Sequence, residues 1–322
     1  MAAVAVVACE REESQSGVFS DELVSLEVRI PAEDTKISGA GGDEEKAVSD
    51  YQIFVFNMDS GLLEAYMTSD SSAENITLQC TVGLKEIVVL ANAPDLSTVV
   101  SYDDLKTKRS ALSDNAEGAL VMEGHSSKKL TATANTVTVN ISRIVSKVVL
   151  SSVSVDFEQD KYDEMDFTIT EVYLTNVAGD RGYLAESSDP AVWYNKNAKD
   201  PAAAVKALIY ADVDDVNLKG VGAYTDAHHF YCCPNPYTSD DFSGTAWTVK
   251  PTRLVVEAML GTELYYYPIS LPVLAPNTQY NVSLTIVRPG VKSPEQDMRK
   301  NDAAVTIKVE DWKETDAITE RI

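Results

Sequence analysis

The residues with the clearest capacity for chemistry lie in one short segment, residues 228–233 (His-His-Phe-Tyr-Cys-Cys), which holds two histidines and two cysteines. Structural zinc sites use pairs of ligands on separated turns, and the chain offers no second pair, since its remaining histidine, His125, stands alone. Adjacent cysteines also disfavour a disulfide between Cys232 and Cys233. We therefore expect an aromatic-rich loop or strand edge here rather than a metal centre.

The acidic residues give no stronger sign of catalysis. Residues 212–217 supply several oxygens, but Val216 occupies an acidic position of the EF-hand pattern and the glycine is missing, which favours a solvated turn over a calcium site. Nucleophile-elbow, phosphate-loop and dinucleotide motifs are absent from the sequence. A glycosidase-like carboxylate pair would arise by chance among so many acidic residues. We expect no catalytic residue, no cofactor and no bound metal.

The charge balance restricts the partners. The chain has 322 residues, with 27 basic and 50 acidic side chains and a net charge of −23. Such a surface repels nucleic acid and anionic lipid, so neither is an expected partner. The sequence contains no apolar run of about 20 residues, the length that a membrane-spanning helix needs. We therefore expect contact with a membrane only through a covalently attached lipid.

That lipid has a candidate attachment site at Cys9. Residues 6–9 (Val-Val-Ala-Cys) have the form of a lipoprotein signal cleavage site, at the end of a short apolar run. The run is too short to span a bilayer and lacks a positive leader, so we expect the true initiator to lie upstream. The following polar residues resemble a flexible tether. Residues 1–20 are thus predicted to be a truncated signal and tether.

A strand that could be cut away follows the tether. Residues 23–30 alternate in the manner of a strand and lead into a glycine-rich, acidic loop with a single basic residue, Lys36. Such a loop is open to proteases because its backbone is hydrated and buries little. Loss of the strand would leave unpaired N–H and C=O groups, which a strand from another copy could bond. The apolar residues of this removable strand are Leu23, Leu26, Val28 and Ile30.

The rest of the chain reads as short strands, which predicts an all-β fold of two sandwiches with a few short helices. Residues 51–56 are expected to form a buried strand, and residues 86–91, which are apolar on both faces, are expected to form a central strand. Short helices are expected after Ser101 and Asp200, and a loop over residues 114–129. An acidic composition shift at 156–166 places a domain boundary there, giving units of residues 21–155 and 156–322.

The order of these pieces resembles the type V pilins, or fimbrillins, of Bacteroidales. The shared pieces are the Cys9 motif, the strand at 23–30, and residues 51–56, 87–93, 143–148, 266–269, 277–290 and 309–312. The resemblance implies two stacked, transthyretin-like β-sandwich domains. It also implies export as an outer-membrane lipoprotein, trimming at the cell surface, and polymerisation into a fimbria that supports adhesion.

Carried over to this chain, the resemblance assigns roles to individual residues. Cys9 takes the lipid, and an Arg- or Lys-type protease cuts after Lys36, where the family more often has Arg, with Arg29 as a second candidate. The donated strand is residues 312–322, with Trp312, Ala317, Ile318 and Ile322 as its apolar residues. This tail is polar, and its alternation is weak. The implied partners are other copies of the chain or other pilin subunits, the trimming protease, and a host glycan or protein.

Two rival functions remain open at this point. A tip adhesin or glycan-binding lipoprotein of the same fold would use the aromatic residues 224–237 and Trp247, because aromatic rings stack on sugar faces. The alternative for those rings is packing in the core or between domains. An enzyme such as a glycosidase is the third reading, and nothing in the sequence favours it.

Overall fold

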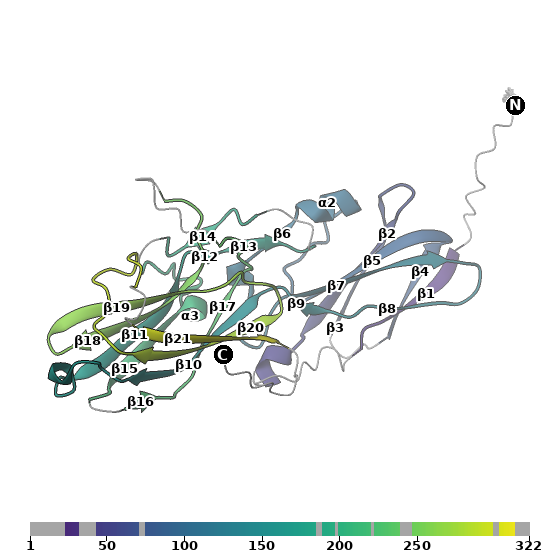
Figure 1. Cartoon of the computed structure of the whole chain (residues 1–322). Coiled ribbons are helices and arrows are strands. Elements are labelled where there is room, and N and C mark those ends of the chain that lie inside the picture. Colours follow the sequence, from purple (N-terminus) through teal and green to yellow (C-terminus); the bar gives the residue numbers. More distant parts are fainter. Residues whose placement is uncertain are drawn as a thin grey trace, which may run out of the picture.

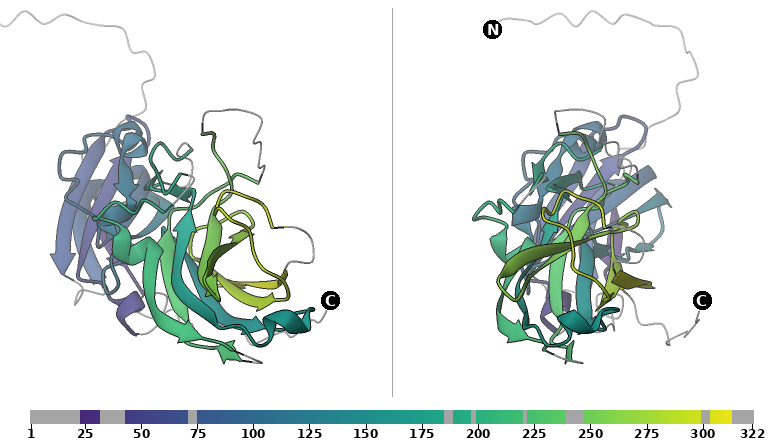
Figure 2. Two further views of the ribbon diagram at one scale, coloured as in Figure 1. Left: turned by 90° about the vertical axis from the view of Figure 1, so that its left-hand side faces the viewer. Right: turned by 60° about the vertical axis from the view of Figure 1, so that its left-hand side comes forward.

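The structure is a computed structural model that describes residues 23–31, 43–70, 75–184, 189–196, 199–219, 222–238, 247–298 and 303–312. Figure 1 shows strands through most of this length and short helices between them. Figure 2 shows the purple and blue strands of the first half beside the green and yellow strands of the second. The all-β fold of two stacked sandwiches is therefore the fold of this chain.

The N-terminal sandwich consists of two sheets of unequal size. The larger has the order β3-β2-β5-β7-β9, formed by β2 (Asp50–Asn57), β3 (Leu63–Asp70), β5 (Gly83–Ala91), β7 (Met122–Leu130) and β9 (Ser142–Arg143). The smaller has the order β4-β1-β8, formed by β1 (Leu23–Arg29), β4 (Asn75–Thr81) and β8 (Asn135–Thr138). Their facing side chains form one apolar core, which includes Leu26, Ile53 and Val89.

β2 and β5 are apolar on both faces because both faces are covered. One face of each strand enters the core between the two N-terminal sheets, as Ile53 and Val89 do. Phe54 and Val88, on the opposite face, belong to a second core that continues into the C-terminal half. The buried strand expected at residues 51–56 and the central strand expected at residues 86–91 are both confirmed, since β2 and β5 are interior strands of the five-stranded sheet.

The C-terminal sandwich pairs a five-stranded sheet with a four-stranded one. The first has β10 (Ser146–Val155) beside β20 (Thr278–Ile286), with β21 (Ala303–Asp311) at one edge and β16 (Ala223–Tyr224) and β17 (His228–Cys232) on the other side of β10. The second has the order β15-β11-β18-β19, formed by β11 (Phe167–Thr175), β15 (Tyr210–Asn217), β18 (Arg253–Leu260) and β19 (Glu263–Ser270). β19 and β21 are therefore edge strands.

Short elements connect the two halves. The described helices are η1 (Asp43–Lys46), α2 (Tyr102–Thr107), η2 (Leu112–Asp114), η3 (Asp160–Tyr162) and α3 (Lys206–Ile209). β6 (Arg109–Ala111) pairs with β13 (Asp180–Gly182), which joins the halves, and β12 (Val177–Ala178) pairs with β14 (Trp193–Tyr194). α2 is capped as expected, since the Ser101 side chain accepts a hydrogen bond from the Asp104 amide. The helix expected directly after Asp200 is instead α3, which begins at Lys206.

The sheets also bear on the expected domain limit at residues 155–156. β10, which that limit assigns to the first unit, pairs with β16, β17 and β20 of the second. β9, directly before it, pairs with β7 of the first. We therefore propose that the boundary lies between β9 and β10, near Ile144. The acidic stretch that suggested the later limit contains η3 and precedes β11.

Candidate functional site

β1, the strand expected to be removable, lies in the middle of its sheet rather than at an edge. It pairs antiparallel with β4 along its whole length, from Leu23 opposite Thr81 to Arg29 opposite Asn75. On its other side it pairs in parallel with β8, from Leu26 to Arg29. β1 therefore satisfies the main-chain groups of two neighbours that do not bond to each other.

One face of β1 is anchored in the core. Val24, Leu26, Val28 and Ile30 are all at most 6% exposed, and they belong to the core of the N-terminal sandwich. Full burial of such side chains contributes about 1.5–3 kcal/mol each. Side chains along a strand alternate between its two faces, so Val24 shares the inward face with Ile30. Leu23 lies on the opposite face and is 63% exposed. Three of the four predicted apolar residues thus point inward, and Val24 takes the place of Leu23.

Departure of β1 would open a trench of defined shape. The facing edges of β4 and β8 would stand about 10 Å apart, which is two strand spacings. Its floor would be apolar, since the neighbouring inward side chains in the same core are those of Ile76, Leu78, Cys80, Val137 and Val139. One further strand restores both ladders and covers this floor, which is the geometry of β-augmentation.

Of the two predicted processing positions, the structure describes Arg29 but not Lys36. Arg29 has an exposed side chain that forms an ion pair with Glu27 at 3.1 Å, yet its carbonyl accepts a hydrogen bond from the Val139 amide at 2.9 Å. A protease that needs unpaired, extended backbone cannot engage Arg29 while β1 is in place. Lys36 lies outside the described residues, as does the predicted lipid site, Cys9.

At the other end of the chain, only the first of the predicted donor residues is described. Trp312 follows β21 and is 2% exposed, with its ring against Tyr231 and Arg143. Ala317, Ile318 and Ile322 lie outside the described residues. Trp312 thus belongs to the folded body, so any donated segment that leaves this body intact begins after it.

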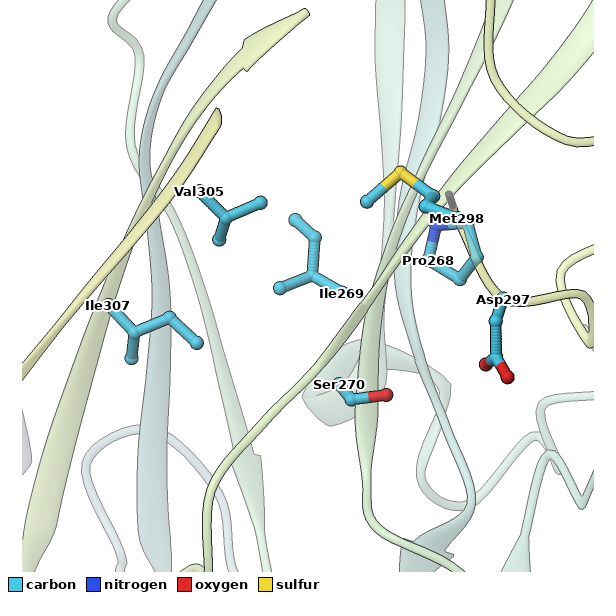
Figure 3. A pocket seen from close by; sticks show the side chains of 7 residues that line it. All are labelled: Pro268, Ile269, Ser270, Asp297, Met298, Val305 and Ile307. Carbon is cyan, nitrogen blue, oxygen red and sulfur yellow. The ribbon is translucent and has the colours of Figure 1, made fainter. Parts of the chain in front are cut away.

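A cavity with a mixed lining lies between the edge strands β19 and β21 of the C-terminal sandwich. This cavity of about 600 Å³ separates the two edge strands and is lined by Pro268, Ile269, Ser270, Asp297, Met298, Val305 and Ile307. Figure 3 shows Val305 and Ile307 of β21 facing Ile269 of β19 across this space. Val305 is 37% exposed, so the inward face of β21 is only partly covered. Ser270 and Asp297 are the polar members of this lining.

The residues with possible metal or catalytic chemistry are placed apart or buried as packing groups. His228 stacks on Tyr224 within the sheet, and burial lowers its pKa. Cys232 and Cys233 are buried free thiols, and burial raises the pKa of Cys232 to about 12. Residues 212–217 belong to β15. Within the described residues, no group of three or more His, Cys, Asp or Glu side chains could hold a metal ion.

The aromatic residues proposed as a sugar platform separate into two places. Tyr224 pairs with His228, whereas Tyr237 and Trp247 gather around Trp193, with ring centroids 6.0 and 5.4 Å from it. The Trp247 indole donates a hydrogen bond to Asn176 at 3.1 Å. The three rings are half-buried and tilted against one another, so they contribute to packing and also keep part of their faces in solvent.

The described helices include none that could cross a bilayer as an apolar span.

Comparison with known proteins places this geometry in context. Residues 24–172 match the family model described as the major fimbrial subunit protein (FimA). The fold is similar to that of a candidate cell adhesion protein from Parabacteroides distasonis, with a TM-score of 0.66, 17% identity, and coverage of 91% of this chain and 99% of that one. No curated protein sequence matches the chain.

Two further solved structures share the fold over a similar length. A candidate cell adhesion protein from Bacteroides eggerthii has a TM-score of 0.65 and 20% identity, with coverage of 90% of this chain and 96% of that one. A fimbrilin (FimA) from Porphyromonas gingivalis has a TM-score of 0.63 and 15% identity, with coverage of 91% and 98%. At these identities the likeness concerns the fold.

Proposed function

Because the chain belongs to the fimbrillin family, we propose that it is a shaft or accessory subunit that polymerises by strand exchange. The family makes it a fimbrial subunit that assembles with other fimbrial subunits at the cell surface. The observation that carries the mechanism is the position of β1. It is a central strand, with an apolar face in the core, and the sequence that follows it contains a candidate cut site at Lys36.

The proposed sequence of events starts at the membrane. Cys9 carries the lipid of an outer-membrane lipoprotein precursor, and a protease cuts after Lys36. Arg29 is the weaker candidate because its main chain is bonded within the sheet. The cut frees β1 from the covalent chain, so that it can leave the trench between β4 and β8. The tail that follows Trp312 in a second subunit, with Ala317, Ile318 and Ile322, then fills the trench.

The energetics explain why cutting is needed. In the uncut chain β1 is tethered beside its own trench, so its effective concentration exceeds that of any strand from another molecule. After the cut this advantage is lost, and β1 can diffuse away. An incoming strand then gains a ladder of main-chain hydrogen bonds on two sides together with apolar burial. The uncut protein is therefore expected to stay monomeric.

Limited digestion with trypsin tests this proposal. The trimmed protein should form ladders on an unboiled gel, and its N-terminal residue should lie in the loop after β1. A chain that lacks residues 313–322 serves as the matched control, since it should be trimmed equally and form no ladder. Trimmed protein that remains monomeric at high concentration, or ladders that persist without residues 313–322, would contradict strand exchange.

A tip adhesin or glycan-binding role is the second candidate. It is favoured by the half-exposed rings of Trp193, Tyr237 and Trp247, with the Lys196 ammonium 5.1 Å from the Trp247 ring. A glycan array probed with the full chain tests it. A signal that is lost in Trp247→Ala would support this role, and an array that stays silent at high protein concentration would remove it.

A further inference from the structure

Five buried side chains from five separate segments meet near the junction of the two sandwiches. Glu45 is on η1, Arg143 on β9, Lys147 on β10 and Tyr231 on β17, and Trp312 follows β21. Each is at most 4% exposed. We call this set the junction cluster. Charged groups are rarely buried this deeply unless they are paired, so the contacts of Glu45 are central to the cluster.

Glu45 is bonded at both its side chain and its main chain. Its Oε1 lies 2.6 Å from the Lys147 ammonium and accepts a hydrogen bond from the Tyr231 hydroxyl. Its Oε2 accepts a hydrogen bond from the Trp312 indole at 3.2 Å. Its carbonyl accepts two hydrogen bonds from the Arg143 guanidinium, at 3.0 and 2.8 Å. One residue thus holds four partners, and the farthest along the chain is Trp312.

The same partners hold the Trp312 ring. The Arg143 guanidinium lies 4.4 Å from the ring centroid, a distance typical of a cation–π contact. The Tyr231 ring stacks on Trp312, with centroids 5.8 Å apart and planes at 18°. The Trp312 amide also donates to the Asn277 carbonyl at 3.2 Å, which fixes the backbone at the end of β21.

The charges make this arrangement depend on one carboxylate. Arg143 and Lys147 are both cationic and both buried. The Glu45 carboxylate is bonded to Lys147, and its charge also acts on Arg143, whose guanidinium is bonded to the Glu45 main-chain carbonyl. Without Glu45, two like charges would remain in a site of low polarity, and Arg143 already has one nitrogen, Nη1, without a partner among the described residues. Loss of the carboxylate should therefore loosen the whole cluster, including Trp312.

The places of these residues in the chain give the cluster a role in assembly. Glu45 comes after both candidate cut sites, so it stays with the body when β1 leaves. Trp312 directly precedes the tail proposed to be donated. The carboxylate therefore links the segment behind the cut to the root of the tail, although these are 267 residues apart in sequence.

From this arrangement we propose that Glu45 is a positioning residue that holds the root of the C-terminal tail at Trp312. The proposal deepens the proposed function and rests on it for its role in assembly. Trimming removes β1 and leaves the junction cluster intact. The donated segment then begins at Lys313 and leaves the subunit from a fixed point, while Trp312 stays docked in the donor.

A comparison of two carboxylates that each pair with a buried lysine tests this. Glu64 pairs with Lys85, whose side chain is fully buried. This pair joins β3 and β5 and also bonds Thr81 at the end of β4, and none of its described contacts is with β1 or with residues 308–312. Glu45→Gln and Glu64→Gln therefore remove equivalent charges at different places. Hydrogen exchange of the uncut, full-length monomers is measured for residues 308–312, for η1 and for β1.

We expect Glu45→Gln to speed exchange at residues 308–312 and in η1 by at least tenfold and to leave β1 unchanged. Glu64→Gln should leave residues 308–312 at the wild-type rate. Trp312→Phe keeps a ring against Tyr231 but removes the N–H that Glu45 accepts, so it should reproduce the faster exchange even if Glu45→Gln folds poorly. Unchanged exchange at 308–312 in both cluster variants, or an equal rise in Glu64→Gln, would overturn the proposal.

A second readout separates this inference from strand exchange itself. After trimming, Glu45→Gln should form ladders at least threefold more slowly than wild type, because a loose root makes the tail harder to place. If the wild-type protein forms no ladder, the strand-exchange proposal fails. The hydrogen-exchange rates of the uncut monomers still decide the role of Glu45. A wild-type rate of ladder formation in Glu45→Gln would overturn its positioning role.

Discussion

β1 and β21 have similar sequences and opposite surroundings. Both alternate aliphatic and polar residues, with Val24, Leu26 and Val28 in one and Val305, Ile307 and Val309 in the other. β1 has a partner on each side and an inward face that is closed. Among the strands that the structure describes, β21 pairs with β20 alone, and Val309 is 53% exposed. A strand of a sandwich is replaceable when its departure would expose a trench between two other strands. The alternation of apolar and polar residues in a strand does not show whether it has such neighbours.

The largest expected effect comes from removing β1 altogether. A chain that begins at residue 37 loses four buried side chains at about 1.5–3 kcal/mol each, so its N-terminal sandwich should be unstable or should fill the trench by assembling. Urea unfolding with analytical ultracentrifugation measures both outcomes. A monomer as stable as the full chain would remove the contrast between β1 and β21.

Single substitutions sharpen the same contrast. Leu26→Ala should lower the free energy of unfolding by about 2–5 kcal/mol, because Leu26 is fully enclosed in the core. Val305→Ala, in the partly open edge beside the cavity, should lower it by less than about 1 kcal/mol. Equal losses in urea titrations of the two variants would show that β21 is enclosed as tightly as β1.

Acid should weaken the junction cluster before it affects β1. Burial by itself would raise the pKa of the Glu45 carboxyl, but the hydrogen bonds from Lys147, Tyr231 and Trp312 and the charge of Lys147 outweigh it and lower the pKa. A carboxyl with a lowered pKa in the folded state stabilises the fold above its unfolded pKa, and this stability is lost as the pH falls through the folded value.

Glu45→Gln should therefore be less stable than wild type by about 3 kcal/mol at pH 7, and the difference should shrink as the pH falls below the ordinary glutamate value of 4.5. Glu117 and His229, which form an ion pair beside Tyr231, are the same in both proteins and do not contribute to this difference. A difference in unfolding free energy that does not change from pH 7 to pH 3 would contradict the lowered pKa.

The smallest effect on stability is expected at the two processing positions. Arg29→Gln changes an exposed side chain and should alter the free energy of unfolding by less than about 0.5 kcal/mol. We expect an equally small effect of Lys36→Gln. Their effects on trimming should differ, since Lys36→Gln should block trypsin conversion and Arg29→Gln should not. Mass spectrometry of the trimmed product measures this, and conversion that depends on Arg29 would show that β1 opens before it is cut.

The sequence predicts those strands whose burial follows from their own pattern of apolar and polar residues. The apolar runs of β2 and β5, the alternation of β1 and the cap at Ser101 are local signals, and the structure agrees with them. The expected loop at residues 114–129 was wrong in its second part, which forms β7. That strand contains Glu123, Lys128 and Lys129, and it is held by pairing with β5 and β9, which no local pattern records.

The junction cluster escaped prediction for a similar reason. Its members come from five segments, and their meeting depends on how the two sandwiches stack. One signal was present, since Arg143 and Lys147 stand within a run of β-branched residues, where a buried cation needs a carboxylate partner. The sequence does not say that this partner is Glu45. Likewise, the acidic stretch after β10 suggested a domain boundary there. Composition indicates where loops lie, but it does not indicate which strands pair with one another.

The central claim is that the trench occupied by β1 accepts a strand from another molecule. A synthetic peptide of residues 22–31 added in excess to freshly trimmed protein tests this most directly, with a peptide carrying Leu26→Asp and Val28→Asp as the matched control. The account predicts that the native peptide binds and prevents ladder formation, while the control peptide does neither. Ladders that form equally in the presence of both peptides would contradict it.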